Sequence, residues 1–194
     1  MYLGQLFMEA DDDDPRKGFI VRRTVDADDA EEEKRHRANY AAHSDALETT
    51  GFWGAQGAGC IFFAQDTKRF LIAHRSQHVE QPSTWGSWGG AIDAGEDPLT
   101  AAKREASEEN GYEGPFEAVP MYVFVKGTFR YSNFLIIVPH EFTPELDWET
   151  QGYVWTKFGQ WPQPLHFGLV ALFKDPASAK LMRKLAQPPK AKIA

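Results

Sequence analysis

The chain has 194 residues, of which 42% are apolar, 25% charged and 13% aromatic, a composition typical of a globular protein. The formal net charge of −7 argues against non-specific duplex binding, which needs clustered Lys and Arg. Cys60 is the single cysteine, which excludes an internal disulfide and a multi-cysteine zinc site. Because no long apolar run or basic-then-apolar N-terminus is present, we expect a cytoplasmic protein without membrane contact.

Residues 1–50 differ from the rest, with thirteen acidic against seven basic residues. Their like-charge runs, Asp11–Asp14 and Glu31–Glu33, repel and resist packing. We therefore interpret residues 1–50 as an acidic N-terminal extension, with a candidate strand over Gly18–Val25 and a candidate helix over Ala30–Thr49. Packing on the core, homodimerisation and membership of a larger parent protein all stay open as roles for this extension.

From residue 51 onward the sequence predicts one domain, residues 51–186, followed by a basic tail, residues 187–194. Its predicted elements are a hairpin of Gly57–Ala64 and Arg69–Arg75, a turn-rich stretch from Pro82 to Gly90, a helix over Asp97–Asn110, strands over Ala118–Val125, Tyr131–Val138 and Gly152–Phe158, and helices over Leu165–Phe173 and Ala177–Leu185. This order favours an α/β fold in which helices cover a mixed sheet.

The chemistry is concentrated in the predicted helix over Asp97–Asn110. Glu105, Glu108 and Glu109 are spaced i, i+3 and i+4, which places all three carboxylates on one helix face. Such a cluster is tolerable when a cation lies among the carboxylates, and hard oxygen ligands favour Mg²⁺ or Mn²⁺. A solvated acidic face is the alternative interpretation of the triplet taken alone.

A longer pattern surrounds this triplet. After Gly90 come five residues and a glutamate, then seven residues and Arg-Glu, and the fixed positions are Gly90, Glu96, Arg104, Glu105, Glu108, Glu109 and Gly111. The pattern resembles the Nudix box, G-x5-E-x7-R-E-U-x-E-E-x-G-U, where U is a bulky aliphatic residue. Ala106 and Tyr112 depart from the pattern only at U positions, which are packing positions.

The resemblance implies a Nudix-type α/β/α sandwich with a central mixed β-sheet, in which the box forms a loop, a helix and a loop. It further implies Mg²⁺- or Mn²⁺-dependent hydrolysis of a diphosphate linkage in a nucleoside diphosphate derivative. Nucleotide sugars such as ADP-ribose, nucleoside triphosphates and dinucleoside polyphosphates share that linkage, and a capped RNA end is the one nucleic acid that does. A Nudix-fold module that binds or senses a nucleotide without turnover is the alternative.

Roles for the box residues follow from the same resemblance. The implied metal ligands are Glu105, Glu108, Glu109, the Gly90 carbonyl and, through water, Glu96. Glu105 is also the candidate for positioning or deprotonating the attacking water, and Arg104 for orienting a glutamate through a bidentate pair. Glu96 could instead pair with Arg104.

Outside the box the sequence offers weaker candidates. A further catalytic acid or base is sought among Glu141, Glu145, Asp147 and Glu149, and we favour Glu149 because it lies at the mouth of a predicted strand.

For the substrate, Arg75 ends a strand that points toward the box and could meet a phosphate. Tyr131 and Asn133 share one strand face and could stack on and hydrogen-bond a base. A surface role for Arg75 and core roles for Tyr131 and Asn133 stay open. For His166 we favour a structural role.

Overall fold

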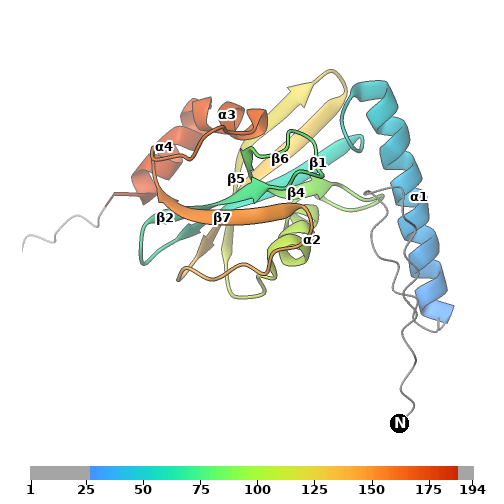
Figure 1. Cartoon of the computed structure of the whole chain (residues 1–194), viewed down its shortest axis with the longest axis horizontal. Helices are drawn as coiled ribbons and strands as arrows, with labels where there is room; N and C mark the ends of the chain where they lie inside the picture. Colours follow the sequence, from blue (N-terminus) through green and yellow to red (C-terminus); the bar gives the residue numbers. More distant parts are fainter. Residues whose placement is uncertain (1–26, 188–194) are drawn as a thin grey trace, which may run out of the picture. The chain divides into compact units, whose positions relative to one another are not determined.

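A computed structural model of the chain describes residues 27–187 (Figure 1). By its contacts the chain divides into two units, Met1–Ala42 and His43–Ala194. Helix α1 runs over Ala27–Thr50, a little longer than the predicted helix. The acidic run Asp11–Asp14, the strand predicted over Gly18–Val25 and tail residues 188–194 lie outside the described residues.

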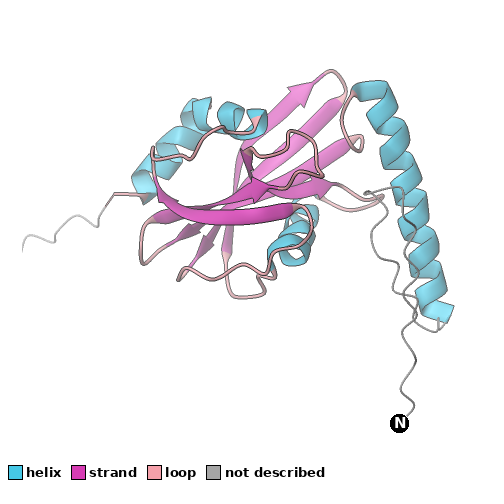
Figure 2. Ribbon diagram, viewed as in Figure 1, coloured by secondary structure: helices cyan, strands magenta, loops and turns pink. Residues whose placement is uncertain are grey.

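The centre of the second unit is a seven-stranded mixed sheet (Figure 2). Its strands are β1 (Gln56–Ala64), β2 (Arg69–Arg75), β3 (Trp85–Gly86), β4 (Trp88–Ala91), β5 (Glu117–Lys126), β6 (Phe129–Val138) and β7 (Thr150–Lys157). Strand β1 pairs in parallel with β6 and antiparallel with β2 and β4. In addition, β2 pairs antiparallel with β3 and β7, and β6 pairs antiparallel with β5.

Helices cover both faces of the sheet, as predicted. The alternation of side chains along β1 sends Cys60 and Phe62 into a core that contains alanines of α2. Ile61 and Phe63 belong to the opposite core, which contains Leu169 of α3. Figure 1 shows α2 (Pro98–Asn110) on one face and α3 (Phe167–Lys174) and α4 (Pro176–Leu185) on the other.

The stretch from Pro82 to Gly90, predicted only as turns, contains strands β3 and β4. Glycine weakens the sequence signal of a strand, yet here its missing side chain allows close packing. At Gly89, which has φ +148°, a Cβ would lie against the Ala58 carbonyl of β1 and the Tyr131 hydroxyl. Strand pairing therefore depends on glycine at the place where propensity argues against a strand.

Helix α2 has well-defined ends. Asp97, predicted as its first residue, is instead its N-cap, and its carboxylate Oδ1 accepts from the N–H groups of Leu99 (3.0 Å) and Thr100 (3.2 Å). Pro98 opens the helix, and Gly111 closes it in the left-handed region with φ +69°. No helix within residues 27–187 has the length and apolar character that a membrane crossing requires.

Candidate functional site

Strand β4 and helix α2 bring the two halves of the box together. A Cβ added to Gly90 would lie 2.7 Å from Oε2 of Glu105 and 2.8 Å from its Oε1. The Glu105 carboxylate therefore lies directly against the bare backbone of β4, which only glycine permits. This contact places the predicted metal ligands Gly90 and Glu105 side by side.

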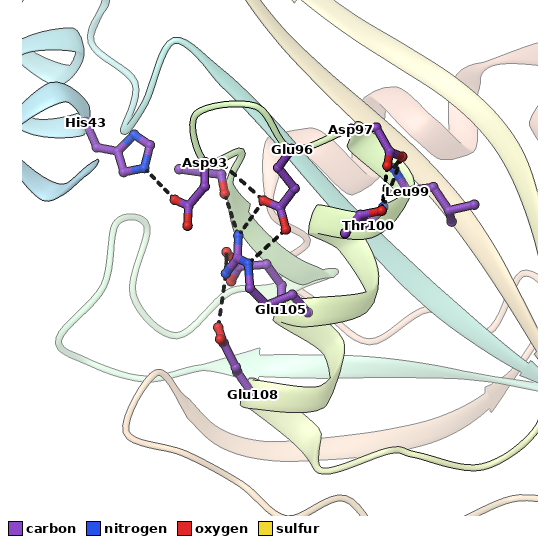
Figure 3. A network of polar contacts seen from close by, with 10 residues as sticks. His43, Asp93, Glu96, Asp97, Leu99, Thr100, Glu105 and Glu108 are labelled. Carbon is purple, nitrogen blue, oxygen red and sulfur yellow. Dashed lines mark hydrogen bonds and ion pairs between the residues drawn. The ribbon is translucent and has the colours of Figure 1, made fainter. Parts of the chain in front are cut away.

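Arg104 binds three carboxylates of the box, those of Glu96, Glu105 and Glu108, which Figure 3 labels. Its Nε and Nη2 donate to the two oxygens of Glu96 at 3.1 and 3.0 Å, and Nη2 also donates to the Ala91 carbonyl at 3.1 Å. Its Nη1 donates to Glu105 at 2.8 Å and to Glu108 at 3.1 Å. One guanidinium thus links the loop before α2 to two glutamates of the helix.

The structure favours one of the two roles considered for Glu96. Both of its oxygens accept from Arg104, and Oε2 also accepts from the Asp93 N–H at 3.1 Å. Its side chain is 12% exposed. Glu96 therefore anchors Arg104 and closes the box loop in this structure.

Glu109 is the most buried acid of the triplet, at 8% exposure. Its Oε2 accepts from the Gly89 N–H of β4 at 3.0 Å. Burial, reinforced by the charges of Glu105, Glu149 and Asp147, raises the pKa of Glu109 well above its usual range. A buried carboxylate among other carboxylates is stable as an anion only when a cation compensates it.

Glu149 and Asp147 belong to the same electrostatic cluster. Burial raises the pKa of Glu105 to about 7 against the opposing effect of Arg104, and the charges of Glu108 and Glu149 add to the rise. Burial also raises the pKa of Glu149, helped by Asp147 and opposed by Arg75. Of the four acids considered outside the box, Glu149 and Asp147 therefore lie near it.

The other two acids considered outside the box have different surroundings. Glu141 pairs with Arg69, whose Nε donates to it at 2.6 Å. Glu145 packs on Gly111 at the end of α2, since a Cβ there would lie 3.1 Å from the Glu145 Cβ. Glu141 is therefore held in an ion pair, and Glu145 lies at the end of α2.

The donor set fits a hard divalent cation, because it consists of carboxylate oxygens whose charges oppose one another. Within residues 27–187 no three His, Cys, Asp or Glu side chains are arranged around one metal position. Arg104 lies between Glu105 and Glu108 instead, and Glu108 is 57% exposed. Arg104 bonds only Oε1 of Glu105 and Oε2 of Glu108, which leaves the other oxygen of each carboxylate for a cation.

Tyr131 lies near the box but on the sheet face away from α2. It is in register with Gly57 of β1, and Cβ atoms added at Gly59 or Gly89 would overlap its hydroxyl. Burial raises the pKa of that hydroxyl, which also lies within electrostatic reach of Glu105 and Glu109. Gly57, Gly59 and Gly89 thus make room for one aromatic ring across the sheet from α2.

Asn133 and Arg75 have different surroundings. Asn133 is 5% exposed, and its Nδ2 donates to the Tyr122 carbonyl at 2.8 Å, so its amide is engaged inside the sheet. Arg75 donates from Nε to the Glu80 carbonyl at 2.9 Å, and its charge lowers the pKa of both Glu149 and His166. Arg75 is therefore brought to the acidic cluster, while the Asn133 side-chain amide is directed into the sheet.

Two features of the site had no clear signal in the sequence. His43 Nε2 lies 3.2 Å from Asp93 Oδ1, so a residue of the predicted extension contacts the box loop. Ser87 lies next to the Tyr131 hydroxyl and lowers its pKa against the larger effect of burial. Both contacts join residues more than forty positions apart, and neither residue belongs to the box pattern.

Comparison with known proteins agrees with this geometry. Over 61 residues the chain is 39% identical to a CMP-5'-(N-acetyl-N-hydroxy-3-aminopropyl)phosphonate hydrolase of Streptomyces rubellomurinus. This match covers 31% of this chain and 30% of that protein. Over 64 residues it is 39% identical to the putative 8-oxo-dGTP diphosphatase 3 of Mycobacterium tuberculosis, with the same coverages of 31% and 30%. The chain thus spans less than a third of the length of these curated relatives.

A solved structure shows the same fold. The crystal structure of RenU, a Nudix hydrolase of M. smegmatis, superimposes with a TM-score of 0.56 at 24% identity and covers 71% of this chain and 90% of that one. This likeness confirms the predicted α/β fold with its mixed sheet. The profile of the NUDIX domain family matches residues 54–175. This chain belongs to the NUDIX domain family.

Proposed function

We propose that this chain hydrolyses the diphosphate linkage of a nucleoside diphosphate derivative with the help of Mg²⁺ or Mn²⁺. The observation that carries the proposal is the clustering of carboxylates on β4, where Glu105 lies against Gly90 and Glu109 accepts from the Gly89 N–H at 3.0 Å. Acids held this close repel one another unless a cation joins them. The family to which the chain belongs supports the same reaction class.

Within this proposal Glu105, Glu108 and Glu109 hold the divalent ion, together with the Gly90 carbonyl. When bound, the ion neutralises phosphate oxygens and lowers the pKa of an attacking water. Arg104 keeps Glu105 against β4 and ties it to the loop through Glu96. The protein thereby fixes the ligands on rigid elements.

Glu105 and Glu149 are the two candidates for receiving the proton of the attacking water. Burial raises the pKa of Glu105 to about 7 without metal, and the charge of a bound ion would lower it, so that Glu105 is an anion able to accept a proton near neutral pH. Glu149 is also held in a buried setting, which raises its pKa, but it comes from outside the box. The proposal assigns the proton to Glu105 and a supporting electrostatic role to Glu149.

Arg75 and Tyr131 are the proposed substrate contacts. Arg75 carries a positive charge next to Glu149 and can meet a phosphate of the substrate. Tyr131 lays its ring on glycines of β1 and β4, on the sheet face away from α2, and a base or ribose can pack on that ring. Asn133 is proposed only to support the strand that carries Tyr131, because its amide bonds the Tyr122 carbonyl.

A substrate panel with Mg²⁺ and with Mn²⁺ tests the proposed function. The panel contains ADP-ribose, a nucleoside triphosphate, 8-oxo-dGTP, a dinucleoside polyphosphate, a capped RNA end and a CMP phosphonate of the kind named for the Streptomyces relative. We expect metal-dependent cleavage within the diphosphate of at least one compound, with products identified by mass. Binding of metal and nucleotide without any cleavage would support the sensor module instead.

A further inference from the structure

A cavity of about 420 Å³ lies far from the box. Its wall combines the turn between β1 and β2, the end of β7 and the end of α4, and its cationic residues are Lys68, Lys157 and Arg183. We call it the distal cavity. Lys157 ends β7, whereas Glu149 directly precedes β7. At about 3.3 Å per strand residue, Glu149 and Lys157 are roughly 26 Å apart.

The three cations of the distal cavity have no carboxylate partner among residues 27–187. Lys68 Nζ lies 5.7 Å from the centroid of the Phe63 ring, and the Arg183 guanidinium carbon 5.6 Å from that of Phe158. Lys68 and Arg183 therefore lie over aromatic rings rather than beside carboxylates.

The acids near this wall have partners other than the three cations. Asp66 Oδ2 lies 3.1 Å from His140 Nδ1. Glu141 pairs with Arg69 and also accepts from the hydroxyl of Thr67, a residue of the wall. In contrast, Arg69 and Arg104 each have a glutamate partner. In a chain with a net charge of −7, three cations that face one cavity and form no ion pair within residues 27–187 leave net positive charge there.

The lining of the cavity restricts what can bind. Its volume of about 420 Å³ suits a small molecule rather than a folded partner. A single carboxylate would leave most of the positive charge uncompensated, whereas a diphosphate or triphosphate matches three cations. Phe158 and Ala186 supply apolar wall beside the cations, which suits an organic group attached to the phosphates.

We propose that the distal cavity binds a di- or triphosphate group, carried by a nucleotide or as inorganic polyphosphate, at a site separate from the box. Arg183 and Lys157 donate to the phosphate oxygens from α4 and β7, and Lys68 adds its charge from the turn. The proposal does not depend on hydrolysis at the box.

Calorimetric titration in the presence of EDTA tests this site, because without metal the acidic box repels polyphosphate. Inorganic tripolyphosphate, ADP and adenosine are titrated into the whole chain. We expect tripolyphosphate and ADP to saturate one site, with adenosine giving no heat. Tighter binding of ADP than of tripolyphosphate identifies the nucleotide as the ligand, and the reverse identifies the inorganic chain.

Variants connect that binding to the cavity. Combining Lys157→Gln with Arg183→Gln is expected to weaken tripolyphosphate binding by about a hundredfold, roughly tenfold for each lost cation. Lys180→Gln removes a charge from the exposed face of the same helix, outside the cavity wall, and should bind like the unmodified chain. Hydrolysis of any substrate found for the box should be equal in all these proteins.

Two results would overturn the distal site. One is the absence of saturable tripolyphosphate binding at millimolar concentration in a chain whose circular dichroism is native. The other is binding that survives in the double variant and is lost in Arg75→Gln, which would place the anion at the box. Failure of the substrate panel leaves both of these readouts unaffected.

Discussion

At the scale of single residues, the site depends on contacts between charged side chains and bare backbone. Arg104 makes hydrogen bonds to three glutamates and to one carbonyl. Glu105 is held between that guanidinium and the Cα of Gly90. The arginine and the glycine of the box thus position the same carboxylate from two sides.

Gly90→Ala tests this positioning. The new Cβ would lie 2.7–2.8 Å from the Glu105 carboxylate, and the flexible glutamate can move aside. We therefore expect hydrolysis to fall about a hundredfold, while the free energy of unfolding changes by less than about 1 kcal/mol.

Gly152→Ala in β7 is the matched control, because its nearest neighbour would be the His74 Cβ at 3.8 Å. Equal activity of the two alanine variants would contradict the proposed role of the Gly90–Glu105 contact. Activity is measured on the substrate found in the panel, and stability by urea unfolding.

His166 gives a prediction for stability against pH. It is the N-cap of α3, and its Nδ1 accepts from the Gly168 N–H at 3.2 Å. Burial, together with the charge of Arg75, lowers the pKa of His166 from 6.5 to about 4. The unfolded chain therefore takes up a proton first as the pH falls, and stability is lost between about pH 6.5 and 4.

The lowered pKa of His166 reduces the free energy of unfolding by about 1–2 kcal/mol near pH 5. His166→Asn retains a capping side chain and removes the titration. Urea unfolding at about pH 7.5 and pH 5 gives the free energy of unfolding at both values. The difference between them should be smaller in this variant by about 1–2 kcal/mol. An unchanged difference between the two pH values would show that the native His166 is protonated at pH 5.

At the scale of elements, the sequence predicts α2 most clearly and strands β3 and β4 least clearly. Asp97, Pro98 and Gly111 carry the start and stop signals of the helix, and the structure uses all three. Strands β3 and β4 were missed because they are short and rich in glycine, and because their stability comes from pairing with β2 and β1. Such tertiary pairing has no local signal.

The end of α2 is coupled to the loop that carries Asp147 and Glu149. The Asn110 carbonyl accepts from the Glu145 N–H at 3.0 Å, and Gly111 has φ +69° beside the Glu145 side chain. Gly111→Ala is expected to lower the free energy of unfolding by about 1–2 kcal/mol, because alanine is strained in the left-handed region.

Gly111→Asn separates that strain from crowding. Asparagine tolerates the left-handed region better than alanine, yet its Cβ meets Glu145 at the same 3.1 Å. We expect Asn to restore part of the stability lost with Ala, as measured by urea unfolding. Equal loss in both variants would assign the cost to the contact with Glu145.

The candidate site shows the same limit of prediction. Helical spacing indicated that Glu105, Glu108 and Glu109 share a face, but it could not tell buried Glu109 from exposed Glu108. Strand alternation grouped Tyr131 with Asn133, but only the folded chain shows that the Asn133 amide bonds the Tyr122 carbonyl. Roles that depend on neighbours distant in sequence require the structure.

At the scale of the whole molecule, the described charges are segregated along the sheet. Acidic side chains gather where β4, α2 and the start of β7 meet, and uncompensated cations gather at the other end of β7. The net charge of −7 therefore describes neither region. A divalent ion at the acidic end would reverse the local field for an anionic substrate.

The central claim is that the carboxylates of α2 hold the ion that drives hydrolysis, and Glu108→Gln tests it most directly. Glu108 is exposed, so the change leaves the core intact, whereas its amide cannot supply an anionic ligand. Glu113→Gln, an exposed acid just beyond α2, is the control. We predict that Mg²⁺-dependent hydrolysis is lost in Glu108→Gln and retained in Glu113→Gln, with native circular dichroism in both; full activity in Glu108→Gln would contradict the account.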